Sequence, residues 1–111
     1  MRKFFKTVRA SLVLAALVLP AGARADQTVQ LGMTDRGFEP AELAGGAGER
    51  LKIEVTNRTA AAMEFESFEL NRERVVQPGQ TVSIYVSGLE AGRYEFFDDF
   101  NTARRGVLVV R

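Results

Sequence analysis

The chain has 111 residues, of which 15 are basic and 14 acidic, and it contains neither cysteine nor histidine. This length accommodates one domain at most. The missing residue types exclude disulfides, thiol redox chemistry, Cys/His zinc sites and any catalytic triad built on a histidine. Carboxylate, amide, hydroxyl, thioether and basic side chains remain for chemistry.

The first 25 residues have the pattern of a secretory leader. Basic residues at the start precede an apolar run over residues 10–19, and Ala23-Arg24-Ala25 then matches an Ala-x-Ala cleavage site. The run is shorter than the roughly 20 apolar residues that span a bilayer, and a small N-terminal membrane anchor is the alternative. We therefore predict a signal peptide over residues 1–25, a periplasmic mature domain over residues 26–111, and no membrane anchor after cleavage.

Removal of this leader changes the charge of the protein. All 14 acidic residues follow Ala25 and five of the 15 basic residues precede it, so residues 26–111 carry ten basic and 14 acidic groups, a net charge of −4. A mildly acidic domain without a basic stripe offers nucleic acid little to bind. Cations or a basic protein surface suit it better.

Strand-like segments alternate with turn residues roughly every ten positions along the mature chain. Regular alternation of apolar and polar residues predicts strands over residues 28–33, 51–57 and 81–86. Pro40 restricts a further extended segment, residues 38–43, to a sheet edge or a strand start. No segment keeps a helical period over ten positions. The sequence predicts an all-β fold, an antiparallel Greek-key β-sandwich of about seven strands.

The apolar faces of these segments predict the core. We expect inward-facing side chains at Leu51, Ile53, Val55, Val82, Ile84, Tyr94, Phe96, Val107 and Val109. Phe65, Phe68, Leu70 and Phe100 are also expected inside the core. Residues 71–74 are predicted to form a polar turn.

Two stretches combine apolar and acidic residues, over residues 63–71 and 94–101. The second stretch reads as a hairpin whose loop carries polar groups at the end of the domain. We place the function where these two stretches can meet.

The order of the elements resembles the cupredoxin family. The matching features are Phe38-Glu39-Pro40, Gly48-Glu49, a strand ending at Asn57, Met63-Glu64-Phe65, Pro78-Gly79-Gln80 and Gly92-Arg93-Tyr94-Glu95-Phe96. Residues 63–67, 70–73 and 96–101 are further similar to small periplasmic cupredoxin-like proteins that accompany bacterial iron-permease systems. This resemblance covers the mature chain. It implies a role in handling iron, or copper that oxidises iron, with a membrane iron permease or another periplasmic uptake protein as partner.

The sequence departs from the cupredoxin copper site. A blue-copper centre needs a cysteine thiolate and two imidazoles. By resemblance, Met63 stands where the first histidine would be, Asp98 near the cysteine and Asn101 near the second histidine. No type-1 blue copper site and no ordinary cupredoxin electron transfer are therefore expected.

An oxygen-rich set with one thioether remains at this end of the domain. We predict that an iron or copper ion binds Met63, Glu66, Asp98, Asp99 and Asn101. In the alternative, Met63 fills the core, Glu64 and Glu66 are solvated acids, and the two aspartates stabilise a turn.

These observations favour a metal-handling accessory protein that assists iron, or copper-linked iron, uptake. The alternatives are a metal-free interaction domain that docks to a transport or redox partner, and a redox protein that borrows a metal ligand from another chain. Adjacent aspartates without a base or nucleophile are not a catalytic constellation, so the sequence predicts no catalytic residues.

Overall fold

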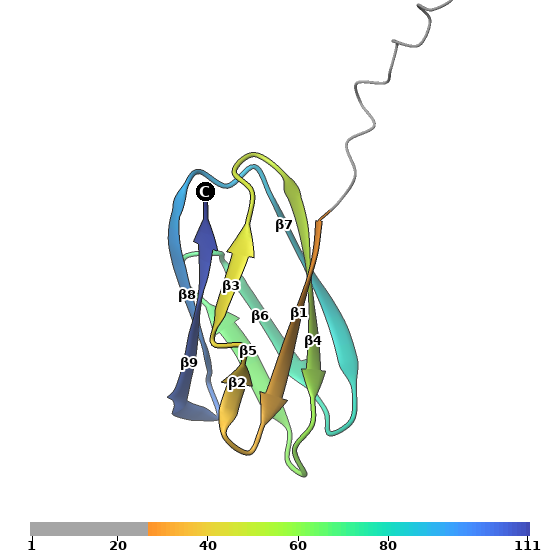
Figure 1. Ribbon diagram of the computed structural model, residues 1–111. Helices are drawn as coiled ribbons and strands as arrows, with labels where there is room; N and C mark the ends of the chain where they lie inside the picture. Colours follow the sequence, from red (N-terminus) through yellow and green to blue (C-terminus); the bar gives the residue numbers. More distant parts are fainter. Residues whose placement is uncertain (1–26) are drawn as a thin grey trace, which may run out of the picture.

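The computed structural model describes residues 27–111 as nine strands in two facing sheets (Figure 1). The first sheet has the order β2 (Gly37–Glu39), β1 (Gln27–Thr34), β4 (Arg50–Asn57) and β7 (Thr81–Ser87). The second has the order β3 (Glu42–Gly45), β9 (Asn101–Val110), β8 (Gly92–Asp98), β5 (Met63–Ser67) and β6 (Arg72–Val76). The predicted leader lies outside the described residues. Within residues 27–111, no helix has the length and apolar character needed to cross a membrane.

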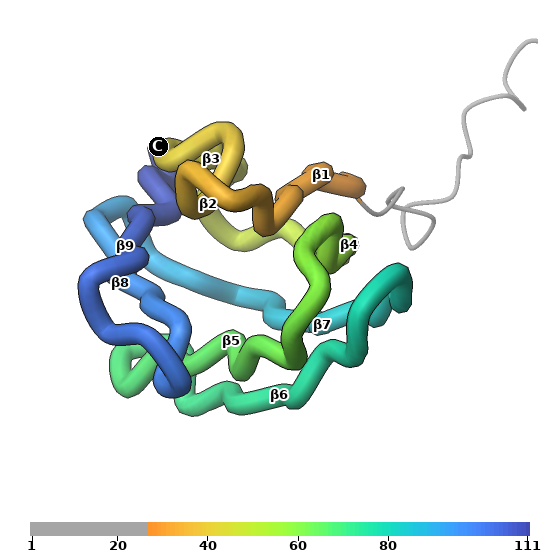
Figure 2. The backbone as a smooth tube through the Cα atoms, turned by 90° about the horizontal axis from the view of Figure 1, so that it is seen from below, coloured from red at the N-terminus to blue at the C-terminus, as the bar shows by residue number. Residues whose placement is uncertain are grey.

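The two sheets form the predicted all-β sandwich, and Figure 2 shows their backbones facing each other in a view along the strands. The expectation of purely antiparallel pairing was wrong for two pairs, because β1 pairs with β4 and β3 with β9 in parallel. Parallel neighbours arise because the chain leaves a sheet, passes through the other one and returns to the first through a crossover connection.

The extended segment at residues 38–43 is divided between the two sheets. β2 pairs with β1 in the first sheet, and β3 pairs with β9 in the second. The division falls at Pro40, which has no N–H to donate to a continuing ladder. Ala41 follows, and its carbonyl accepts a hydrogen bond from the N–H of Val107 at 2.9 Å. One predicted strand is therefore two strands in the structure. This division accounts for part of the difference between the nine strands observed and the seven or so predicted.

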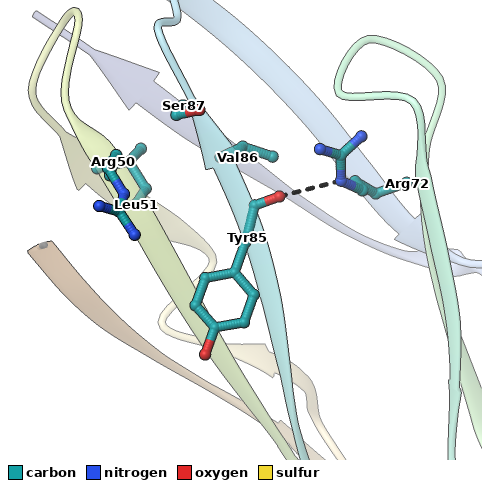
Figure 3. A pocket seen from close by; sticks show the side chains of 6 residues that line it. All are labelled: Arg50, Leu51, Arg72, Tyr85, Val86 and Ser87. Atoms are coloured by element: carbon teal, nitrogen blue, oxygen red, sulfur yellow. Dashed lines mark hydrogen bonds between the residues drawn. The ribbon is translucent and has the colours of Figure 1, made fainter.

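The predicted polar turn at residues 71–74 was also misplaced. The turn occupies residues 68–71, where Asn71 has a φ of 56°, a conformation that asparagine tolerates. Strand β6 begins immediately afterwards. Arg72 Nε donates to the carbonyl of Tyr85 on β7 at 3.0 Å (Figure 3). Arg74 Nη1 donates to the carbonyl of Ser83 at 3.4 Å. Arginine side chains thus connect the two sheets where their edge strands meet.

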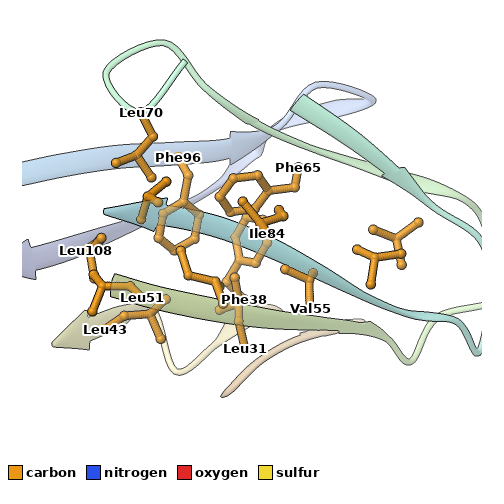
Figure 4. Close-up of a cluster of buried hydrophobic side chains, with 14 of the residues drawn as sticks. Leu31, Phe38, Leu43, Leu51, Val55, Phe65, Leu70, Ile84, Phe96 and Leu108 are labelled. Carbon is orange, nitrogen blue, oxygen red and sulfur yellow. The ribbon is translucent and has the colours of Figure 1, made fainter. Parts of the chain in front are cut away.

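The core lies between the sheets and is centred on three aromatic rings (Figure 4). Phe96 contacts Phe38 edge-on, with ring centroids 5.0 Å apart, and stacks on Phe65 at 5.2 Å. The predicted inward residues of β4 and β7 are confirmed, as are Phe65, Leu70 and Phe96, and Tyr94 packs against this core from a half-buried position.

Four residues that were predicted to point into the core do not belong to the core cluster. Phe68 and Phe100 are 78% and 56% exposed because each lies in a turn beyond the last strand residue. On β9, Leu108 and Val110 enter the core cluster in place of the predicted Val107 and Val109, although Val109 is only 7% exposed. The reason is the register with β8, which places Leu108 opposite the inward-facing Tyr94.

Candidate metal centre

The two acid-rich stretches meet at one end of the sandwich, where β5 begins and β8 ends (Figure 1). Phe65 of β5 pairs with Asp98 of β8. The backbone N–H of Asp99 also donates to the carbonyl of Glu64 at 2.9 Å. Adjacent strands therefore bring together residues more than thirty positions apart in the sequence.

Three carboxylates converge on the outer face of the five-stranded sheet. The carboxylate oxygens of Glu64, Glu66 and Asp99 lie within 4.8 Å of one another; we call these residues the acidic cluster. Alternation along β5 turns Met63, Phe65 and Ser67 inward and the two glutamates outward. The first turn residue after β8 supplies the third carboxylate. The cluster is thus a surface site, accessible to a cation from solvent.

Glu73 adds a fourth carboxylate beside the cluster. It lies on β6 directly opposite Glu66, and its carboxylate contributes to the raised pKa of Glu64. Sequence analysis missed Glu73 because it assigned this residue to a polar turn. Only the β5–β6 register reveals its position, because nothing in the local sequence distinguishes it from a solvated acid.

Partial desolvation and like charges raise the pKa of both glutamates of the cluster. Desolvation, the hydrogen bond with Glu73 and the charges of Glu73, Asp99 and Glu66 raise the pKa of Glu64 to about 7. Desolvation and the charges of Glu73 and Asp99 also raise the pKa of Glu66. Removal of a proton leaves adjacent negative charges uncompensated, which is the electrostatic condition that attracts a cation.

Asp98 lies beside the acidic cluster but points into the sandwich. It is 1% exposed, and its Oδ1 accepts hydrogen bonds from the backbone N–H groups of Glu64 at 2.9 Å and Phe100 at 3.0 Å. Its Oδ2 lies 3.9 Å from Arg104 Nη1. These contacts neutralise the carboxylate and close the β8–β9 turn, the structural role that sequence analysis kept as an alternative.

The two thioethers at this end are buried. Met63 and Met33 both belong to the core cluster, and Arg104 Nη1 lies 3.7 Å from the sulfur of Met33. Inward orientation on β5 separates the Met63 side chain from the outward Glu66. Asn101 is exposed at the start of β9. Of the five predicted ligands, the structure brings Glu66 and Asp99 together and adds Glu64.

A buried asparagine positions the start of β5. The Asn57 side-chain amide donates to the carbonyls of Ala61 at 2.8 Å and Val76 at 2.9 Å. Its Oδ1 accepts from the backbone N–H of Thr59 at 2.9 Å. The loop between β4 and β5 is therefore ordered around one side chain, which fixes where the glutamates of β5 emerge.

Comparisons with known proteins agree with this architecture. A family model described as a cupredoxin-like domain matches residues 7–110. The protein RP394 of Rickettsia prowazekii is 29% identical over 83 residues, which cover 74% of this chain and 66% of that protein.

Two solved structures share the fold at low sequence identity. The first is the metal-binding domain of the Cu(I)-exporting ATPase CopA of Streptococcus pneumoniae, solved with Cu(I). It is 19% identical with a TM-score of 0.68, covering 84% of this chain and 90% of that one. The second is auracyanin A, a blue copper protein of Chloroflexus aurantiacus. It is 17% identical with a TM-score of 0.67, covering 78% of this chain and all of that one.

These findings confirm the predicted cupredoxin-like fold. A type-1 copper centre does not fit the chain, because the sequence has no cysteine or histidine to supply the thiolate and the imidazoles. Carboxylate oxygens are the strongest metal ligands left to the chain, and among the described residues three of them converge in the acidic cluster.

Proposed function

The chain belongs to the family of cupredoxin-like domains, and from this premise we propose that it handles a metal ion at the acidic cluster as an accessory to iron uptake. The observation that carries the proposal is the convergence of Glu64, Glu66 and Asp99, whose carboxylate oxygens lie within 4.8 Å of one another. The family fold supplies the two strands and the turn that bring these oxygens together.

The ligand chemistry favours a hard or borderline divalent cation. Carboxylate oxygens suit iron, manganese, calcium and magnesium, whereas Cu(I) prefers thiolates and thioethers. The only nearby thioethers among the described residues, Met33 and Met63, are fully buried in the core. Fe(II) is the cargo we favour, in line with the resemblance to proteins of iron-permease systems. Copper that oxidises iron remains the alternative cargo.

The geometry suits transfer better than storage. Asp99 is exposed, and Glu64 and Glu66 are half-buried, so the cation keeps solvent ligands and an open route of exchange. Binding replaces the proton that Glu64 holds near neutral pH, and the carboxylate of Glu73 adds negative charge beside the site. A cation captured this way can be passed on without any change of the fold.

The site of action we propose is the periplasm, next to a membrane iron permease or another uptake protein. The basic, apolar and Ala-x-Ala pattern of residues 1–25 supports export. Intact-mass measurement of protein from the periplasmic fraction tests this. A mature chain that begins at Asp26 is expected, and a chain that retains Met1 would contradict it.

Anaerobic calorimetric titration with Fe(II), Mn(II) and Cu(II) tests the metal site. The Glu66→Gln, Asp99→Asn double variant keeps the shape of two ligands but removes their charges, and should bind at least about tenfold more weakly. A Glu42→Gln, Glu90→Gln variant makes the same change of net charge at exposed acids outside the cluster and should bind normally. Cu(II) should give no intense blue colour.

The outcomes separate the two functions. Equally poor binding of all three ions by the wild type and both variants would refute metal handling. A metal-free docking domain would then be the better account. Loss of binding in the control variant as well would show that the effect is general electrostatics and not a ligand set.

A further inference from the structure

A second feature of the five-stranded sheet lies at the other end of β5, where this strand turns towards β6. A hollow of about 300 Å³ opens on the outer face there, lined by Phe68, Glu69, Glu95, Phe97 and Arg105. The acidic cluster, where we propose metal binding, contributes none of these residues.

Two phenylalanines form the apolar part of this hollow. Phe97 points away from the core cluster, yet it is only 8% exposed. The ring of Phe68 covers it edge-on, with centroids 5.4 Å apart, and the guanidinium carbon of Arg105 lies 5.0 Å from its centroid. Phe68 itself remains 78% exposed. A large apolar side chain is thus presented to solvent above a second aromatic ring.

The turn that carries Phe68 is fixed on both sides. Ser67 Oγ donates to the carbonyl of Glu95 at 2.7 Å and accepts from the N–H of Leu70 at 3.1 Å. Glu69 Oε1 accepts from the N–H of Glu95 at 2.6 Å. Ser67 and Glu69, on either side of Phe68, therefore bind the carbonyl and the N–H of Glu95 on β8. These bonds hold the Phe68 ring on the outer face of the sheet. A fixed, exposed aromatic ring loses little conformational entropy when a partner covers it.

The surroundings of the hollow are acidic. The outward carboxylates of β5, β6, β8 and their turns are Glu64, Glu66, Glu69, Glu73, Glu95 and Asp99. Two outward basic residues lie among them. One is Arg93 on β8, and the other is Arg105, which lines the hollow and whose Nη2 already lies 3.7 Å from the carboxylate of Glu95. Nucleic acid and anionic membranes would be repelled by this face, whereas a positively charged protein segment would be attracted.

We propose that the hollow binds a segment of a partner protein that presents an apolar side chain flanked by lysine or arginine. The apolar side chain packs against Phe68 over Phe97, and its basic neighbours face Glu69 and Glu95. Aromatic and arginine side chains dominate the energetics of protein interfaces, and the hollow contains both types. Because Glu66 and its neighbours lie on the same face, the partner would dock beside the proposed metal site.

NMR titration of the isotope-labelled full-length chain with blocked tripeptides tests the proposal. The probe has tryptophan between two lysines, and its two counterparts have tryptophan between two glutamates and alanine between two lysines. The lysine–tryptophan peptide should shift the amides of residues 67–71 and 95–97 saturably, and both counterparts should bind more weakly. Phe68→Ala should weaken binding roughly fivefold. Tyr85→Ala removes a similarly exposed aromatic, 55% exposed on the other sheet, and should change nothing.

Three results would overturn the proposal: no saturable shift, equal binding of the glutamate peptide, or unchanged binding by Phe68→Ala. The amide spectrum of the Phe68→Ala variant verifies that it folds, as expected for the loss of a side chain that is 78% exposed. Its Fe(II) titration should match the wild type. A failure of docking can therefore be distinguished from a failure of the metal site.

Discussion

Glu66 on β5 and Glu73 on β6 lie directly opposite each other as paired residues of antiparallel strands. Like charges in this position destabilise a sheet. The carboxylate of Glu64 lies on the same face within 4.8 Å of that of Glu66, and the charge of Glu73 helps to raise its pKa. A bound cation would relieve this repulsion, which links the stability of the sheet to occupancy of the proposed metal site.

Replacement of Glu66 by glutamine should stabilise the metal-free protein and weaken its response to metal. The melting temperature without metal should rise by a few degrees because one charge of the cluster is lost. The increase on adding Mn(II) should become smaller than in the wild type. Thermal unfolding followed by circular dichroism measures both effects. Glu54→Gln is the control. The Glu54 carboxylate accepts a hydrogen bond from Gln30 at 2.7 Å and lies 3.4 Å from Lys52 Nζ, so removal of its negative charge should not stabilise the protein. A lower melting temperature for Glu66→Gln would contradict the prediction.

Stability should decrease with rising pH between about 4.5 and about 7. The folded protein raises the pKa of Glu64 from 4.5 to about 7, so within this window the folded state holds a proton that the unfolded state has released. The free energy of unfolding therefore falls as pH rises, and the raised pKa of Glu66 acts in the same direction. Urea unfolding across the window measures the slope, which Glu64→Gln should reduce. An unchanged slope in that variant would show that Glu64 is not the titrating group.

Asp98→Ala should cost on the order of 3 kcal/mol of stability, because two partly buried N–H groups and the nearby guanidinium of Arg104 lose their acceptor. Asp99→Ala, at the exposed neighbouring position, should cost much less. Urea unfolding of both variants provides the comparison. Equal, small losses would mean that Asp98 does not hold the β8–β9 turn.

Loss of both arginines on β6 should expose the edge of β7 to other molecules. Arg72 and Arg74 donate to the carbonyls of Tyr85 and Ser83, which face away from β4 and would otherwise be open to a further strand. The Arg72→Ala, Arg74→Ala variant should self-associate in a concentration-dependent way, as measured by light scattering coupled to gel filtration. Arg36→Ala, Arg93→Ala removes the same charge at exposed sites and should elute like the wild type. Identical elution of the two double variants would count against edge protection.

Local patterns in the sequence determined the strands that have one buried face. Alternation along residues 51–57 and 81–86 assigned the inward residues of β4 and β7, because a strand places successive side chains on opposite faces. The ordered motifs predicted the cupredoxin-like sandwich, and the absence of cysteine and histidine excluded blue copper. These features depend on residue type and on neighbours within a few positions.

The orientation of β9 could not be obtained in this way. Its last four residues, 107–110, are all apolar, so alternation gives no preference for either face. Packing around Gly106 sets which face of β9 points inward. An added Cβ at this residue would lie 2.5 Å from ring atoms of Phe96 and 2.9 Å from the carbonyl of Ala41. Gly106 therefore faces inward opposite Phe96, and Leu108 and Val110 follow on the same face.

Membership of the proposed site was also decided by tertiary structure. The sequence identified two acid-rich stretches, but it could not distinguish the outward Glu66 and Asp99 from the inward Met63 and Asp98 as ligands. The pairing of β5 with β6 and β8 places Glu73 beside Glu66 and turns Asp98 towards Arg104. The register of two strands is set by contacts between segments that are distant in the sequence. A shift of the pairing by one residue would move every side chain of a strand to the opposite face of the sheet. For this reason composition set the chemistry that the site can use, and strand pairing selected the side chains that can perform it.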